Sequence, residues 1–163
     1  MSPKHSKLVI NLTFVIGACF VLLLDQITKY AVNKIIPASS SIEVIPGIFF
    51  LTNIKNSGAA FGFFQNGTNI LIVISIVAVL LIIFLKIKLS LDSIAYNISL
   101  GFVLGGALGN LVDRYLIGEV TDFFNFVYWP VFNIADSFIV IGFGVIILII
   151  VKEYLRKDYA KRG

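Results

Sequence analysis

The sequence predicts an all-α integral membrane protein of four transmembrane helices, with both termini in the cytoplasm and a short strand-rich segment outside the bilayer. Hydrophobic residues make up 58% of the 163 residues and charged residues only 13%, whereas soluble domains have about 45–50% and about 25%. Four apolar runs are long enough to cross a bilayer. Lysine and arginine lie mainly at one end of these runs, and this asymmetry orients membrane proteins.

The first apolar run, Leu8–Leu24, follows a basic tail at residues 1–7. It resembles a signal peptide, and Ile16–Cys19 resembles a lipoprotein cleavage box. The apolar run continues beyond Cys19, where a mature lipoprotein would have a polar tether, so we interpret it as a transmembrane helix. We expect one membrane domain over residues 1–163, with spans at about 8–28, 68–85, 94–112 and 134–151.

Asp25 and Lys29 stand four positions apart near the end of the first span, on one helical face, where an acid and a base can pair. A helix from Lys7 to Asp25 rises about 27 Å at ~1.5 Å per residue, which places this pair near the far interface. We interpret it as an interfacial ion pair that fixes the depth of the helix. A direct chemical role for Asp25 is the alternative.

Residues 37–66 differ from the rest of the chain because they combine β-branched and aromatic residues with a turn signal at Pro46-Gly47. Each half is too short to span a membrane, so this segment predicts two or three short strands outside the bilayer. Asn56–Gly62 then supplies small residues that allow close approach of another backbone. A loop that re-enters the membrane is the alternative for this segment.

The third span carries Gly101, Gly105 and Gly109 at every fourth position, which predicts close helix packing. Asp113 and Arg114 end this span, and we expect them to form an ion pair or to reach outward. The aromatic connection at 115–132 is typical of a membrane–water interface.

The distribution of charge predicts the topology. Nine of the thirteen basic residues fall on the side of both termini, so this side is expected to be cytoplasmic: Lys4, Lys7, Lys86, Lys88, Lys152, Arg156, Lys157, Lys161 and Arg162. The net charge of +4 therefore does not indicate nucleic-acid binding. The acids gather on the other side, which favours a site that faces outward: Asp25, Glu43, Asp113, Glu119, Asp122 and Asp136.

One cysteine and one histidine exclude Ser–His and Cys–His catalysis and zinc sites built on these residues. Asp122 and Asp136 lie among apolar and aromatic residues without a basic neighbour in sequence. Two carboxylates in a partly dry cleft share one proton, so one can activate water while the other protonates a carbonyl. The helix dipole would favour ionised Asp136, three residues after the expected N-cap Asn133, which makes Asp136 the expected base. The alternatives are a capping carboxylate for Asp136 and a solvated loop acid for Asp122.

Five motifs in this order resemble the bacterial lipoprotein signal peptidases, also called signal peptidase II: Asp25–Lys29, Asn56–Gly62, Gly105–Arg114, Val120–Phe123 and Phe132–Ser137. The resemblance implies an intramembrane aspartic endopeptidase of the bacterial cell membrane with a small extracytoplasmic β-cradle. It implies cleavage of diacylglyceryl prolipoproteins before the lipidated cysteine, contact with membrane lipids, and inhibition by globomycin. No metal or organic cofactor is implied.

The resemblance also implies roles for individual residues. Asp122 and Asp136 match the catalytic dyad. The residues that match positions near substrate are Asn56, Gly109, Asn110, Arg114, Asn133 and Ala135. Asp25, Lys29 and Asp113 match supporting polar positions. The connection at 123–132 is short for the family, so the size of a lid over the cleft is left open.

Three other functions stay open on the sequence alone. Outer acids on a four-span bundle also suit a cation transporter or channel subunit, although the second and fourth spans have almost no polar residues at the midplane. The acids of a purely structural membrane protein would cap helices. A serine–lysine hydrolase would use Ser57 with Lys55, whose amine would have to be buried.

Overall fold

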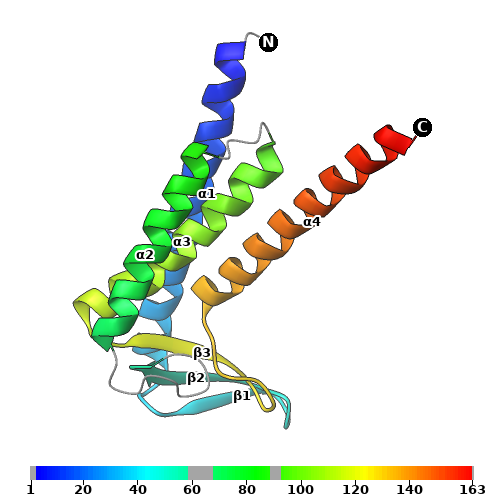
Figure 1. Ribbon diagram of the computed structural model, residues 1–163. Helices are drawn as coiled ribbons and strands as arrows, with labels where there is room; N and C mark the ends of the chain where they lie inside the picture. Colours follow the sequence, from blue (N-terminus) through cyan, green and yellow to red (C-terminus); the bar gives the residue numbers. More distant parts are fainter. Residues whose placement is uncertain (1–2, 59–67, 89–92, 163) are drawn as a thin grey trace.

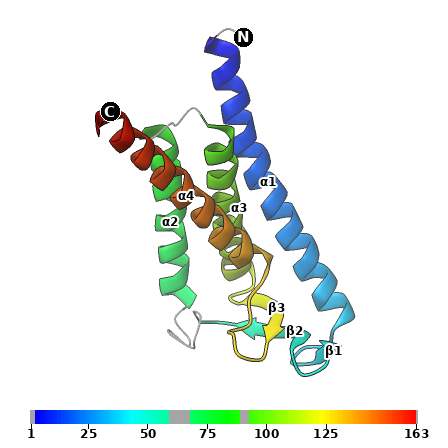
Figure 2. The ribbon, with the colours of Figure 1, turned by 90° about the vertical axis from the view of Figure 1, so that its right-hand side faces the viewer.

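The computed structural model describes residues 3–58, 68–88 and 93–162. Within these residues, four long helices stand over a small antiparallel sheet that lies at one end of them (Figures 1 and 2). The helices are α1 (Pro3–Ile35), α2 (Thr68–Lys88), α3 (Ile94–Leu116) and α4 (Ile134–Arg162). The strands are β1 (Ser41–Ile45), β2 (Phe49–Asn56) and β3 (Val120–Phe126).

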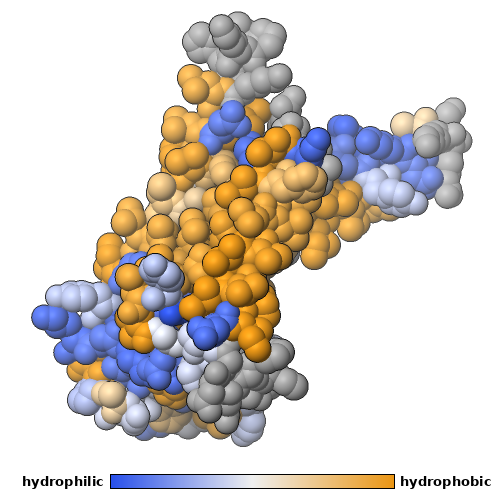
Figure 3. Space-filling model, turned by 60° about the vertical axis from the view of Figure 1, so that its left-hand side comes forward, coloured by the Kyte–Doolittle hydropathy of each residue, from blue (hydrophilic) through white to orange (hydrophobic). Residues whose placement is uncertain are grey.

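All four helices are long and apolar enough to cross a membrane, which confirms the prediction of four long apolar helices. Three of them begin close to the predicted residue, but all continue beyond the predicted end, because lysine, arginine and glutamate after the apolar core are good helix formers. The space-filling view shows an apolar band over the helices, between a polar sheet end and the polar C-terminal end of α4 (Figure 3). The start of α1 and the end of α4 both lie away from the sheet (Figure 1).

The predicted turn at Pro46-Gly47 joins β1 to β2 as an antiparallel hairpin. Gly47 has a φ of 66°, a conformation that glycine adopts without a steric penalty. The turn is closed by a hydrogen bond from Ile48 N to Ile45 O of 3.0 Å. Of the two or three strands predicted within 37–66, two are therefore confirmed, whereas residues 59–66 of that segment lie outside the described part of the chain.

The third strand lies elsewhere than predicted, in the 115–132 connection that we interpreted only as an interfacial aromatic segment. β3 pairs antiparallel with β2, so the sheet order is β1-β2-β3. Val120, Thr121 and Phe123 are β-branched or aromatic and suit a strand, but the pairing joins segments more than sixty positions apart. This pairing brings Asp122 beside the end of β2.

α3 is the central helix, and its glycines allow close packing on two sides. A Cβ at Gly101 or Gly105 would run into backbone carbonyl oxygens of α1, as the predicted GxxxG face requires. A Cβ at Gly106 would lie 2.8 Å from Ile139 Cγ1 of α4. The backbone of α3 therefore approaches both neighbours closely, and polar side chains near its C-terminus can contact α1 and α4 together.

Candidate active site

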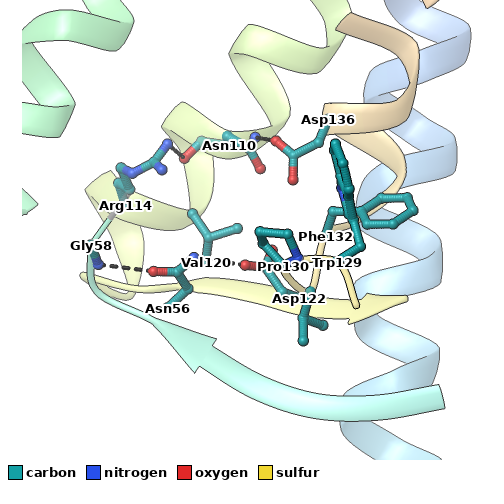
Figure 4. A pocket seen from close by; sticks show the side chains of 11 residues that line it. Asn56, Gly58, Asn110, Arg114, Val120, Asp122, Trp129, Pro130, Phe132 and Asp136 are labelled. Atoms are coloured by element: carbon teal, nitrogen blue, oxygen red, sulfur yellow. Dashed lines mark hydrogen bonds between the residues drawn. The ribbon is translucent and has the colours of Figure 1, made fainter. Parts of the chain in front are cut away.

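A cavity of about 260 Å³ lies where the C-terminal end of α3 and the N-terminal end of α4 meet β2 and β3 (Figure 4). Both candidate carboxylates, Asp122 from β3 and Asp136 from α4, line it. The other lining residues are Asn56, Gly58, Asn110, Arg114, Val120, Trp129, Pro130, Val131 and Phe132. Four of the six residues expected near substrate are thus brought to the cavity or hydrogen-bonded to its carboxylates.

Asp122 is only 3% exposed, and each of its carboxylate oxygens accepts a hydrogen bond from an amide. Asn56 Nδ2 donates to Oδ2 at 2.8 Å and Asn133 Nδ2 donates to Oδ1 at 2.7 Å. Burial raises the pKa of Asp122 to about 6, opposed by the two amide hydrogen bonds and reinforced by the negative charge of Asp136. Asp122 is therefore able to hold or release a proton near neutral pH.

Asp136 lies in the first turn of α4 and takes part in a reciprocal cap with Asn133. Asp136 N donates to Asn133 Oδ1 at 3.0 Å, and Asn133 N donates to Asp136 Oδ2 at 3.3 Å. The prediction of Asn133 as the N-cap is confirmed. The cap uses only one oxygen of Asp136, because Oδ1 accepts from Asn110 Nδ2 at 2.8 Å. Capping and a chemical role are thus compatible.

Two amides join the carboxylates into one hydrogen-bonded network. Asn133 Nδ2 donates both to Asp122 Oδ1, as above, and to Asn110 Oδ1 at 3.1 Å. Asn133 is fully buried and Asn110 is nearly so. Each of the four carboxylate oxygens of Asp122 and Asp136 therefore accepts an N–H group, which fixes the rotation of both carboxyl groups.

A buried ionic cluster lies behind the cavity, between α1 and α3. Lys29 Nζ lies 2.8 Å from Asp25 Oδ2 and 2.8 Å from Asp113 Oδ2. The predicted pairing of Asp25 with Lys29 is confirmed, and both side chains are buried within the protein; their role in fixing the depth of the helix stays a prediction. Lys29 Nζ also donates to Asn110 Oδ1 at 3.0 Å, so this cluster contacts the carboxylate network.

The predicted ion pair between Asp113 and Arg114 is wrong. Asp113 pairs with Lys29 and accepts a hydrogen bond from Gln26 Nε2 at 2.9 Å. Consecutive residues of a helix point in different directions, so Arg114 turns toward the cavity instead. Its Nη1 donates to Asn110 O at 3.4 Å, and its buried Nε has no hydrogen-bond partner among the described residues.

Gly109 and Ala135 support Asp25 and do not line the cavity. A Cβ at Gly109 would run into the Asp25 carboxylate, and Ala135 N donates to Asp25 Oδ1 at 3.0 Å. Ala135 is fully buried. Contact of these two residues with substrate, which the family resemblance implies, stays a prediction.

Sequence reasoning missed Gln26 and the cavity wall formed by the connection after β3. Phe132 N donates to Phe124 O at 3.1 Å, which folds this connection back along β3. Trp129 and Pro130 then lie over the cavity (Figure 4). The short connection at 123–132 therefore contributes a wall of the cavity. The sequence signal for this wall was Trp129-Pro130, which lies between the two candidate carboxylates along the chain.

The alternative sites find less support. Lys55 Nζ donates to Asn33 Oδ1 and to Thr121 Oγ1, both at 2.7 Å, so its amine is engaged away from Ser57. Among the residues that the structure describes, no three histidine, cysteine, aspartate or glutamate side chains gather as a metal site would require. The arrangement favours acid–base chemistry by two carboxylates.

The chain is similar to known proteins along most of its length. The model of the family described as Signal peptidase (SPase) II matches residues 17–152. A lipoprotein signal peptidase of Caldanaerobacter subterraneus subsp. tengcongensis is 47% identical over 129 residues, which cover 78% of this chain and 88% of that protein. One from Staphylococcus aureus is 35% identical over 157 residues, covering 94% and 96%. A solved structure of a bacterial membrane enzyme, determined by the in meso method at 2.3 Å resolution, superposes with a TM-score of 0.82 at 34% identity, covering 89% of this chain and 91% of that one.

Proposed function

The chain belongs to the signal peptidase II family of aspartic membrane peptidases, and we propose that it removes the signal peptide from diacylglyceryl-modified prolipoproteins by cleaving before the lipidated cysteine. The observation that carries this proposal is the cavity lined by both Asp122 and Asp136, with all four carboxylate oxygens held by N–H donors. Relatives that are named lipoprotein signal peptidases support the class of substrate.

In the proposed mechanism the two carboxyl groups share one proton. Asp136 accepts a proton from a water molecule, and the resulting hydroxide attacks the carbonyl carbon of the scissile peptide bond. Asp122 donates its proton to the carbonyl oxygen, and a gem-diol intermediate forms. The proton on Asp136 then passes to the amine leaving group as the C–N bond breaks, while Asp122 takes back its proton from the diol. The raised pKa of Asp122 and the helix N-terminus at Asp136 support this division of roles.

The other cavity residues would bind the substrate around the scissile bond. Arg114 and Asn56 present N–H donors beside the dyad, where peptide carbonyl groups can accept them. Trp129 and Phe132 add apolar surface on the wall formed after β3, suited to the lipid-modified cysteine. Globomycin, a cyclic peptide, would inhibit by occupying the same cavity.

We place both termini in the cytoplasm and the cavity on the extracytoplasmic side of a bacterial cell membrane. The basic residues at the ends of α2 and α4 support this orientation. The ends of α1 and α4 that lie away from the sheet agree with it (Figure 1). A signal peptide that spans the bilayer would then present its cleavage site at the sheet end, beside the dyad.

The test is cleavage of a lipidated prolipoprotein peptide by the purified protein in detergent or lipid. Asp122→Asn and Asp136→Asn keep size and polarity but cannot exchange the proton, so each is expected to lose nearly all turnover while it stays folded. Glu119→Gln removes a nearby acid that does not line the cavity and serves as the matched control.

Three results would change the proposal. Substantial turnover by either asparagine variant would make that aspartate structural. Equal cleavage of a peptide without the diacylglyceryl group would remove the lipid from the specificity. No cleavage by the wild type, with a substrate that a known enzyme cleaves, would favour the ion-site alternative.

A further inference from the structure

We propose that Lys29 is a positioning residue for the dyad, and that it acts by fixing the orientation of the Asn110 side-chain amide. This inference rests on the proposed function, because it concerns the same two carboxylates. Lys29 does not line the cavity and is 3% exposed, so it has no contact with substrate. Its effect must pass through a residue that does.

The ammonium group of Lys29 is surrounded by acceptors. Asp25 and Asp113 each place one carboxylate oxygen 2.8 Å from Nζ, and Asn110 Oδ1 lies at 3.0 Å. An ammonium has three N–H donors and no acceptor, so these three oxygens match its full donor set. The side chain is therefore held in one place by two carboxylates and offers Asn110 only a donor.

A donor at that point determines which way the Asn110 amide faces. With its oxygen toward Lys29, its nitrogen faces Asp136 and donates to Oδ1 at 2.8 Å. The reversed amide would place N–H groups against the ammonium and an oxygen against the Asp136 carboxylate, so both contacts would become repulsive. Asn133 reinforces the same orientation because it donates to the Asn110 oxygen at 3.1 Å.

The same donor-to-acceptor order continues from Asn110 through Asn133 to the Asp122 carboxylate. Asn133 donates to Asn110 and to Asp122, while its oxygen accepts from the backbone N–H of Asp136. Asparagine amides can reverse together, but a lysine cannot become an acceptor. Lys29 and the backbone N–H of Asp136 are thus the fixed donors of the network, and Lys29 is the one that contacts Asn110. Without it, the Asn110 oxygen loses its charged donor, and the reversed amide is opposed only by the contacts with Asn133 and Asp136, so the carboxylates are held less firmly.

A direct test has to separate this role from the stability that an ion pair gives. Lys29→Met alone would leave two buried carboxylates without a cation and endanger folding. Asp113→Asn is the matched background, because it keeps the contact of Lys29 with Asn110. The double variant Lys29→Met/Asp113→Asn removes one charge of each sign, so the net charge of the cluster equals that of the wild type. Lys29→Gln/Asp113→Asn restores N–H donors on a side chain one atom shorter.

The experiment measures kcat and KM on a lipidated prolipoprotein peptide, together with a thermal melt of each variant. Relative to Asp113→Asn, we expect the methionine variant to lose about 100-fold in kcat with KM within about threefold, because misplaced acid–base groups typically cost that much. The glutamine variant should recover at least tenfold of this loss. Equal kcat for Asp113→Asn and the folded methionine variant would overturn the proposal and leave Lys29 as an ion-pair partner only.

If the methionine variant does not fold, a double-mutant cycle decides. Lys29→Gln and Asn110→Ala are combined in the Asp113→Asn background and followed by single-turnover rates. If Lys29 acts through Asn110, the glutamine substitution has less than a twofold effect once Asn110 is gone. Fully additive losses would overturn the proposal. Activity of the wild type in the same assay separates these outcomes from failure of the proposed function, in which no variant and no wild type would cleave.

Discussion

The Asp122→Asn variant is expected to unfold with a weaker dependence on pH than the wild type. Burial raises the pKa of Asp122 from its ordinary value of 3.8 to about 6 in the folded protein. Below pH 3.8 the carboxyl group is protonated in both the folded and unfolded chain, and its contribution to stability is fully present. As the pH rises through about 6 that contribution is lost, because the unfolded chain releases the proton more readily.

The size of the effect follows from the two pKa values. A pKa difference of one corresponds to about 1.4 kcal/mol, so ionising Asp122 lowers the free energy of unfolding by about 3 kcal/mol at high pH. Between pH 5 and pH 7.5 the linkage gives roughly half of this loss, about 1–2 kcal/mol. Asparagine does not titrate. The asparagine side chain would, however, turn its own N–H group toward the N–H donor of Asn56 or Asn133, which lowers the free energy of unfolding by about 1–3 kcal/mol at every pH.

The assay is a thermal melt, followed by helix circular dichroism in detergent at pH 5 and at pH 7.5. The melting temperature of Asp122→Asn relative to wild type should rise by roughly 3–6 °C between the two pH values, because about 1–2 kcal/mol shifts a chain of this size by about that much. Glu153→Gln removes an exposed carboxylate on α4 and is the control. A difference between Asp122→Asn and wild type that stays constant within about 1 °C would refute the raised pKa.

Three further predictions follow from the same structure. Gly105→Ala should lower the melting temperature by the equivalent of about 1–3 kcal/mol, because its Cβ would lie 2.9 Å from a side-chain carbon of α1. Gly144→Ala, whose Cβ would have nothing within 4 Å, should leave the melting temperature unchanged. Equal losses in the two variants would contradict the close packing of α3 on α1. Asn133→Ala should lower the free energy of unfolding by about 1 kcal/mol, through loss of the cap, and kcat by about 100-fold. Ser93→Ala, which removes the N-cap of α3, should lower stability but leave kcat unchanged. Similar kcat values for the two variants would show that Asn133 only caps. The rate kcat/KM should fall as pH rises above about 6, where Asp122 loses the shared proton, and a constant rate from pH 6 to pH 9 would exclude it as the acid.

Local patterns were sufficient to predict the parts of the fold that depend on one segment. Four apolar runs give four helices, and the Pro-Gly turn gives the β1–β2 hairpin. The spacing of Asp25 and Lys29 gives their ion pair, and Asn133 before an apolar run gives the N-cap of α4. Each of these follows from a period, a turn or a cap within a few residues.

The features that sequence reasoning missed depend on how distant segments meet. The pairing of β3 with β2 brings Asn56 to Asp122, and no local pattern contains that register. Asp113 pairs with Lys29 of another helix, although Arg114 is its neighbour in sequence. Adjacent residues on a helix point apart, so a neighbour in sequence is a poor guide to an ion-pair partner.

The packing of α3 and the chemistry of the site are consequences of the same helix face. Gly101 and Gly105 let the backbone of α1 approach α3, and Gly109, one turn further, accommodates the Asp25 carboxylate in the same groove. At this separation Lys29 of α1 reaches Asn110 of α3 at 3.0 Å. A hydrogen bond is lost beyond about 3.5 Å, so a displacement of α1 by roughly half an ångström that the Lys29 side chain does not follow would break this contact. Glycines along α3 therefore influence the geometry of the two carboxylates near its C-terminal end.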